Sequence, residues 1–152
     1  MERQLLLPDI EPGCRADLKR AIEAMPASQA LGLHVRGFHP EGVSVIEMPV
    51  QTRWTFDGHI VQGGIVGTLA DYAGVSAAAA SLDEGWMAST TGFEVHNVAP
   101  ARGERLVAVG HAVSVGRSHA VSTAQVWAVS DGQSTLVAIG TTTCRPFQLK
   151  AG

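Results

Sequence analysis

The chain has 152 residues, of which 45% are hydrophobic, and it carries a net charge of -3. This length suits one compact domain and leaves no room for a second, because a chain near this size buries about two thirds of its unfolded surface. The chain has 11 basic and 14 acidic residues, and the basic ones do not cluster into a stripe. This argues against a nucleic-acid partner.

Neither the start of the chain nor its cysteines indicate export from the cytoplasm. The leucines at 5–7 are followed at once by Pro8 and Asp9, so this apolar run is shorter than a secretory signal core of about 7 to 15 residues. Cys14 and Cys144 have no neighbouring cysteine, which predicts free thiols in a reducing compartment. The six histidines are dispersed and form no metal-ligand motif. We therefore expect a cytoplasmic protein without a metal, another cofactor or a membrane partner.

The first part of the chain is predicted to form a helix and a strand hairpin. Residues 1–30 form an N-terminal extension in which residues 15–25 carry apolar side chains at helical spacing, and Pro26 is predicted to end the helix. We expect this helix to be a strut rather than a lid. Residues 33–38 and 43–50 have the character of strands, with a proline and a glycine in the turn between them.

A long helix is predicted over residues 63–82, where an alanine-rich run begins at a glycine pair. The run is apolar almost all round, as expected of a helix that other structure surrounds. Asp71 and four glycines interrupt it, so it does not resemble a membrane span of about 20 apolar residues.

The second half of the chain is predicted to form four strands, since it is rich in β-branched residues between turn signals. These strands cover residues 89–98, 105–115, 119–129 and 134–146. The order of elements predicts an α+β domain with one long helix on one face of the sheet. The other face must be solvated or covered by a second subunit, so we expect a homo-oligomer.

Asp71 is the strongest functional candidate because it is the one charged or histidine side chain in residues 63–82. An unpaired buried carboxylate is costly, so the protein must pair it, expose it or use it. One interpretation is a solvated stripe or a structural hydrogen bond to a strand, and the other is an active-site carboxylate. Gly67 and Gly74 lie four and three residues away on the same helix face. Since each mid-helix glycine costs about 1 kcal/mol relative to alanine, the two glycines predict close approach by a ligand or another backbone on an open side of the helix, with a helix contact across a dimer as the alternative.

Gly63 and Gly64 begin the same helix, where backbone N–H groups are free and the helix dipole favours negative charge. Such a donor can hold a carbonyl oxygen that becomes negative during hydrolysis. A glycine pair alone is weak evidence, and its position two turns before Asp71 gives it weight.

The motif around Asp71 resembles that of the hotdog-fold thioesterases, in particular the branch of the phenylacetate-degradation and 4-hydroxybenzoyl-CoA thioesterases. The resemblance covers about residues 43–143. Its centre, VQGGIVGTLAD at 61–71, is similar to the family's His-Gly-Gly followed by six residues and an acid. A second block at 90–103 is similar to a family strand that begins with Ser or Thr and ends in Pro-Ala-Arg-Gly.

The resemblance implies a single hotdog domain over residues 1–152, with an antiparallel sheet wrapped around the long helix. It implies an acyl-CoA substrate that is hydrolysed to a carboxylic acid and free CoA. Gly63 would polarise the thioester carbonyl through its N–H, and Asp71 would be the nucleophile or the general base. Thr90 falls where the family has a hydroxyl that positions water or the carboxylate, with Thr91 a less favoured substitute. In the family the acid and the glycine donor belong to different subunits, so a homodimer or a homotetramer is expected.

Two positions depart from the family pattern. Gln62 stands where many members have histidine, and it can hydrogen-bond but cannot change charge with pH. Phe56 stands where some members have an amide and cannot position water, so Gln62, Thr90 or Asp57 would have to assist. Substrate contacts are predicted around the motif and at loop arginines suited to CoA phosphates: Gly64, Phe56, Thr68, Thr91, Arg102, Arg117 and, with the same reasoning, Arg105.

Two other functions are compatible with the sequence. A hotdog dehydratase or hydratase needs a histidine beside an acid, and His59 matches that arrangement poorly. A non-catalytic acyl-CoA binding module would keep the pocket without requiring Asp71.

Overall fold

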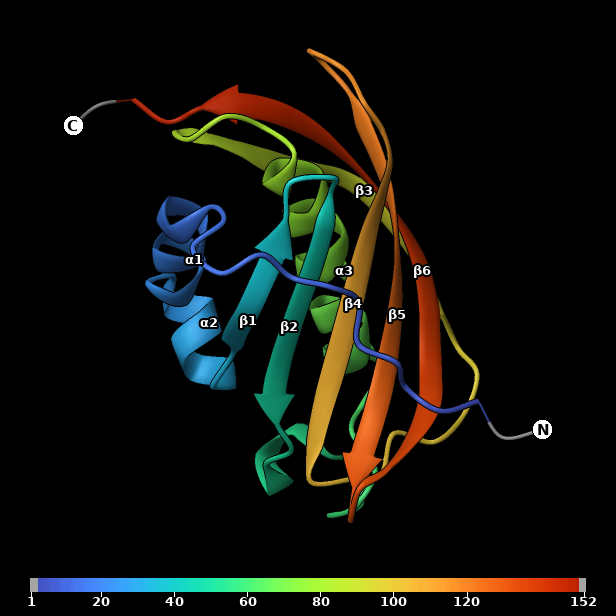
Figure 1. The fold of residues 1–152 in the computed structure, drawn as a ribbon. Helices are drawn as coiled ribbons and strands as arrows, with labels where there is room; N and C mark the ends of the chain where they lie inside the picture. Colours follow the sequence, from blue (N-terminus) through green and yellow to red (C-terminus); the bar gives the residue numbers. More distant parts are fainter. Residues whose placement is uncertain (1–2, 151–152) are drawn as a thin grey trace.

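A six-stranded antiparallel sheet wraps around one long helix in the computed structural model, which describes residues 3–150 (Figure 1). The strand order is β1-β2-β4-β5-β6-β3. The strands are β1 (His34–His39), β2 (Val43–Pro49), β3 (Trp86–Asn97), β4 (Arg105–Val115), β5 (Ala120–Ser130) and β6 (Gln133–Gln148). The helices are α1 (Ala16–Glu23), α2 (Pro26–Leu31), α3 (Gly63–Ala80) and the short 3-10 helix η1 (Thr52–Trp54). The α+β prediction is confirmed, and the outermost two residues at each end of the predicted domain lie outside the described part.

The long helix α3 is held close to the sheet because small residues line the contact. Of its 18 residues, 11 are buried. A Cβ on Gly110 of β4 would overlap the Ala73 carbonyl oxygen, and a Cβ on Gly74 would overlap the Thr142 hydroxyl of β6. The Ser44 hydroxyl of β2 donates a hydrogen bond to the Ala73 carbonyl (2.5 Å). These contacts fix the depth and rotation of α3, and with them the direction in which Asp71 points.

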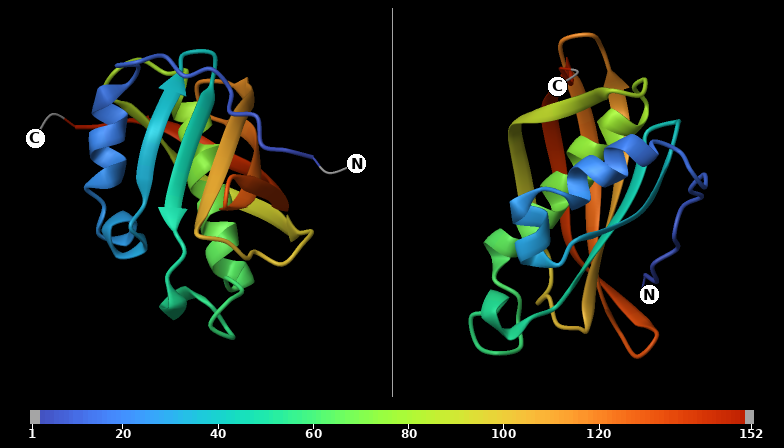
Figure 2. Two further views of the ribbon diagram at one scale, coloured as in Figure 1. Left: turned by 60° about the horizontal axis from the view of Figure 1, so that its bottom comes forward. Right: turned by 90° about the vertical axis from the view of Figure 1, so that its left-hand side faces the viewer.

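The predicted helix before Pro26 is confirmed as α1, which ends at Glu23, but the sequence analysis missed a second helix, α2, which Pro26 begins. Proline suits the first position of a helix, where its missing N–H would have no acceptor and its fixed φ is already helical. The chain turns at Met25, whose extended backbone separates the two helices. Both helices lie beside α3 (Figure 2), and α1 buries Leu18 and Ile22.

The face of the sheet that points away from α3 is partly covered by the N-terminal segment of the chain itself. This segment crosses β2, β4 and β5 before α1 begins (Figure 1). The Leu5 N–H donates a hydrogen bond to the Ser134 hydroxyl (2.7 Å). The Leu5 side chain packs on a cluster of valines from those three strands: Val45, Val107, Val109 and Val129. Cover for this face thus comes from within the chain, which the sequence analysis did not anticipate.

The two edges of the sheet are finished differently. At the β1 edge, the Glu11 N–H donates a hydrogen bond to the Phe38 carbonyl (2.8 Å), and α1 packs against the strand. At the other edge, β3 pairs with β6 alone, and half of its 12 residues are exposed. A bulge at Thr91 interrupts this pairing between Thr90 and Gly92. The β3 edge is therefore open to pairing with another strand.

Candidate active site

Asp71 lies in the middle of α3 on a partly exposed stripe that also includes Thr68 and Val75. Its Oδ1 accepts a hydrogen bond from the Thr90 hydroxyl of β3 (2.8 Å). No cation within residues 3–150 forms an ion pair with it. Burial raises the pKa of Asp71, and the Thr90 hydrogen bond opposes that rise. A carboxylate in this setting is a stronger base than an ordinary aspartate.

The two glycines near Asp71 do not lie on the open side of the helix, contrary to the prediction. Gly74 faces Thr142 of β6, and Gly67 faces Phe93 and Val95 of β3 at ordinary contact distance. Both are buried, so the close approach they permit is that of the sheet.

A cavity of about 270 Å³ adjoins Asp71 between α1, α3 and β3. Apart from Asp71, Tyr72 and Ser76, its lining is apolar: Leu18, Ile22, Met25, Val75, Ala79, Met87 and Ala88. The N-terminal helix is therefore a wall of the cavity next to the carboxylate, which the expected role of a strut does not include.

A second set of polar groups gathers at the N-terminus of α3. The Gln62 side chain caps the helix and accepts a hydrogen bond from the Gly64 N–H (2.9 Å). The Gly63 N–H meets no acceptor within residues 3–150. The Asn97 amide of β3 lies beside it, since a Cβ on Gly63 would be 3.1 Å from Asn97 Nδ2. A hollow of about 420 Å³ opens there, with Phe56 on its lining.

These groups form two separate half-sites, which we call the acid half-site (Asp71 and Thr90) and the amide half-site (Gly63 and Asn97). Gly63 and Asp71 are eight residues apart on one helix, which corresponds to about 12 Å along its axis. One carbonyl group cannot contact both in the same chain.

The remaining residues predicted to contact substrate are distributed along α3 and β3. Thr68 donates its hydroxyl to the Gly64 carbonyl (2.9 Å). Thr91 sits on the bulge and donates to the Thr143 hydroxyl (3.1 Å), so Thr90 alone of the pair contacts Asp71. His59 is exposed, and its N–H donates to the Asp57 carboxylate (2.8 Å) in the loop before α3.

The three arginines proposed for CoA phosphates do not gather at one place, because Arg117 lies at the opposite end of α3 from Arg102. Arg102 is exposed and lies near Asp57, on the side of the amide half-site. Arg117 lines a hollow at the other end of α3, beside Ser81. Arg105 is 3.7 Å from the Glu47 carboxylate. A single chain cannot bring all three to one phosphate.

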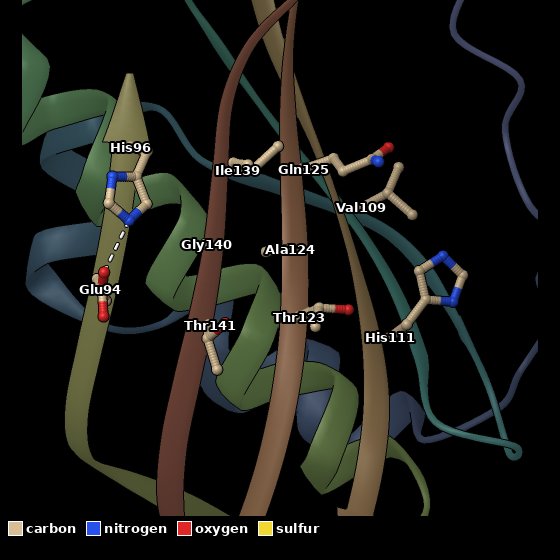
Figure 3. A pocket seen from close by; sticks show the side chains of 10 residues that line it. All are labelled: Glu94, His96, Val109, His111, Thr123, Ala124, Gln125, Ile139, Gly140 and Thr141. Carbon is tan, nitrogen blue, oxygen red and sulfur yellow. Dashed lines mark hydrogen bonds and ion pairs between the residues drawn. The ribbon is translucent and has the colours of Figure 1, made fainter. Parts of the chain in front are cut away.

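Two other candidate centres lack the required chemistry. Cys144 lies close behind Asp71, but it is fully buried, and burial, with the nearby Asp71 charge, raises the pKa of its thiol. A hollow of about 400 Å³ on the outer face of the sheet contains a Glu94–His96 pair (2.7 Å) (Figure 3). It lies on the side of the sheet opposite to α3 (Figure 3), and none of the predicted site residues line it. In the described part of the chain, no three His, Cys, Asp or Glu side chains are grouped to hold a metal, and no helix has the length and hydropathy to traverse a bilayer.

Comparison with known proteins bears on both half-sites. The model of the Thioesterase superfamily matches residues 58–135, which is more than half of the chain and includes Asp71, Thr90, Gly63 and Asn97. The chain belongs to the Thioesterase superfamily. No protein with a curated description matches it in sequence.

Solved structures support this membership of the Thioesterase superfamily. A thioesterase family protein from Silicibacter pomeroyi is 28% identical, with a TM-score of 0.82 over 90% of this chain and 99% of that one. A thioesterase from Haemophilus influenzae is 20% identical, with a TM-score of 0.75 over 91% and 94% of the two chains. The PaaI protein of the Escherichia coli phenylacetic acid degradation operon is 19% identical, with a TM-score of 0.72 over 90% and 99%. Together with the superfamily match, these similarities confirm the predicted hotdog fold.

Asn97 and the residues of the α1 wall were missed by the sequence analysis. Asn97 lies within the second block of family resemblance, and an amide near the end of that strand was the signal available. Strict alternation from Thr90 puts Asn97 on the outer face, and nothing in the sequence marks the bulge between them. The apolar spacing of residues 15–25 identified the helix but could not show that it packs beside Asp71.

Proposed function

We propose that this protein hydrolyses an acyl-CoA to a carboxylic acid and free CoA, with Asp71 as the catalytic carboxylate. The observation that carries the proposal is the Asp71 carboxylate itself, which is half-buried, bonded to Thr90 and without a cationic partner among the described residues. It borders an apolar cavity. The Thr90 hydrogen bond alone is compatible with a structural role, but a structural carboxylate in mid-helix has no need of an apolar cavity beside it and would be expected to pair with a cation or to be fully solvated.

Two routes to hydrolysis are compatible with this geometry. Asp71 can attack the thioester carbon, which forms a mixed anhydride and releases the CoA thiolate before water completes the reaction. Alternatively, it can take a proton from the water that attacks the same carbon. Both routes need an ionised Asp71, and both develop negative charge on the carbonyl oxygen, which the Gly63 N–H and the Asn97 amide would stabilise.

A second copy of the chain would complete the site. The two half-sites of one chain are about 12 Å apart, so the acid half-site needs oxyanion donors from elsewhere. The open β3 edge carries Thr90 and Asn97, one from each half-site. Antiparallel pairing of two β3 strands about a two-fold axis would bring the acid half-site of one subunit toward the amide half-site of the other. Arg102, near the amide half-site, is then the best-positioned cation for the CoA phosphates.

The decisive experiment measures thiol release from acyl-CoA esters that range from acetyl to palmitoyl and include benzoyl and phenylacetyl. Asp71→Asn should keep the fold and lose at least about a hundredfold in kcat. Asp83→Asn, a matched change in an exposed loop, should retain wild-type activity. Wild-type turnover by Asp71→Asn would refute the proposal. Binding of acyl-CoA by the wild type without thiol release would favour the non-catalytic binding module.

The shared site has its own test. Asp71→Asn and Gly63→Pro proteins, each inactive alone, are unfolded together, refolded as a mixture and assayed. Random pairing gives dimers in which one of the two sites is intact, so the mixture should regain up to about a quarter of wild-type activity. No recovery in a mixture whose hetero-oligomers are verified by mass would show that each site belongs to one chain.

A further inference from the structure

The cavity beside Asp71 is elongated along α3. It follows α3 from Asp71 and Tyr72 to Ala79, a distance of about 12 Å along the helix axis. The helix α1 runs beside it in the opposite sense, since Ser28 beyond α1 bonds Tyr72 (3.0 Å) while Arg15 at its start bonds the Ala79 carbonyl (2.5 Å). At one end of the lining Met25, Asp71 and Tyr72 are partly exposed, whereas at the other end Leu18, Ala79 and Met87 are buried. We therefore place the mouth at the carboxylate and the far end at Leu18, Ala79 and Met87.

The far end is apolar and closed. Leu18 and Ala79 are buried, as is Met87, and the cavity lining includes no basic side chain. Asp71 supplies its one negative charge. A ligand that enters from the carboxylate must therefore have an uncharged, apolar tail, because a charged end would be desolvated without a partner.

The wall that α1 provides is fixed in place by a buried arginine. Arg15, with 7% of its side chain exposed, donates hydrogen bonds to the carbonyls of Ala79, Leu82 and Trp86. Asp17 holds the same guanidinium (2.9 Å) and also accepts from the Gly85 N–H (3.1 Å). These bonds tie α1 to the end of α3 and the start of β3, so the far end of the cavity cannot yield easily to a longer ligand.

The volume limits the size of the tail. A cavity of about 270 Å³ corresponds to about nine water molecules at about 30 Å³ each. A methylene group occupies a similar volume, so the space suits about eight to ten carbon atoms.

We propose that this cavity is the acyl-binding site and that Leu18, Ala79 and Met87 set the longest acyl group the enzyme accepts. The substrates are uncharged apolar acyl-CoA esters of up to about ten carbons, single-ring aromatic acyl groups included. This inference rests on the proposed hydrolysis at Asp71.

The test compares kcat/KM for butyryl-, octanoyl-, decanoyl-, dodecanoyl- and palmitoyl-CoA in three variants. Met87→Ala deepens the cavity and should raise the dodecanoyl-to-octanoyl ratio by about tenfold. Ala79→Leu fills the far end and should lower the decanoyl-to-butyryl ratio by about tenfold. Met48→Ala, the same change as Met87→Ala at another buried methionine that does not line the cavity, should leave both ratios unchanged.

The outcomes separate this inference from the hydrolysis on which it rests. Active enzyme whose ratios do not change in Met87→Ala and Ala79→Leu would overturn the cavity assignment and leave hydrolysis at Asp71 standing. If the wild type hydrolyses none of the esters, the proposed function fails, and calorimetric binding of a non-hydrolysable octanoyl-CoA thioether still tests the cavity. Ala79→Leu should then weaken binding by at least about tenfold, and equal affinity for wild type and variant would overturn it. Thermal melting identifies any variant that does not fold. If either Met87→Ala or Ala79→Leu fails to fold, the remaining one of the two tests the cavity assignment.

Discussion

The two halves of α3 have different surroundings, and each is proposed to support a different part of the hydrolysis. From Asp71 onward the helix lies between α1 and the sheet, and its residues at 76–80 are all buried. At its start, Gln62, Gly63 and Gly64 are exposed. A carboxylate gains basicity from a dry environment, whereas amide donors at an open end can be reached by another molecule. In the proposed reaction, the helix thus provides a base and an oxyanion donor at positions that one chain cannot use together.

Among changes at the exposed start of α3, Gly63→Pro is expected to have the largest effect on kcat, because it deletes the proposed N–H donor. Proline is well tolerated at the first position of a helix, and the extended backbone of Gln62 (φ -60°, ψ 136°) is what the residue before proline requires. We expect kcat to fall by about 10²–10³-fold, the usual loss for one oxyanion donor, with an unchanged circular dichroism spectrum.

Gly63→Ala is the matched control for this substitution because it adds a Cβ and keeps the N–H. The new methyl group meets only the flexible Asn97 amide at 3.1 Å. The decrease in kcat for Gly63→Ala should therefore be much smaller than the decrease for Gly63→Pro. Equal losses in the two variants would assign the effect to steric crowding and not to the donor.

Asn97→Ala probes the second amide of the same half-site. A neutral hydrogen bond in an open site contributes about 0.5–1.5 kcal/mol, which is about a two- to tenfold decrease in kcat, and KM should change little. His96→Ala, on the opposite face of the same strand, is the control. A decrease confined to KM would make Asn97 a substrate contact instead.

In the half of α3 that begins at Asp71, Thr90→Val tests the environment of the carboxylate through the pH dependence of kcat/KM. The Thr90 hydroxyl lowers the pKa of Asp71, so its removal should shift the acidic limb of the kcat/KM profile to higher pH, with a smaller change on the plateau. Thr91→Val, which loses only the bond to Thr143, should leave the limb in place. A limb that stays constant or moves to lower pH in Thr90→Val would be inconsistent with Asp71 as the titrating base.

The smallest effect on catalysis is expected from Asp17→Asn, which changes stability instead. The Arg15 guanidinium holds the pKa of Asp17 well below its usual range, so the ionised carboxylate stabilises the fold. Its loss should lower the free energy of unfolding by about 1.5–3 kcal/mol at neutral pH. The difference from wild type should narrow as the pH falls below about 3.9, the ordinary value for aspartate, toward the depressed folded value. A difference that stays constant from pH 7 to pH 2 would contradict this assignment.

Much of the fold was predictable because its signals are local. The alanine-rich run indicated α3, and alternation with turn residues indicated the strands to within a few residues. The second helix, α2, was missed because a proline can stand both after one helix and at the start of the next, and its role depends on the residues that follow it. The cover on the outer face was missed since the Leu5 side chain finds its valine cluster only after strands distant in sequence have paired.

The residues of the candidate site stood out in the sequence where one residue type was isolated from its neighbours. Asp71 was evident as a lone acid in an apolar helix, and the glycine pair drew attention to the amide end. The orientation of Gly67 and Gly74 could not be predicted. Helical spacing shows which residues share a face of the helix, but it does not show which part of the protein that face contacts. The cavity required the tertiary contact between α1 and α3, for which the sequence carries no local signal.

The bulge at Thr91 has a consequence for aligning this strand with those of other proteins. Along a regular strand, side chains an even number of positions apart share a face, yet Thr90 and Asn97, seven positions apart, both face α3. The additional residue absorbs the odd count. A homologue with one residue fewer at this point would need no bulge and would keep both side chains facing its helix. A gap opposite Thr91 is therefore neutral, whereas a one-residue gap between 92 and 97 that is not matched by another bulge would turn the amide toward the outer face.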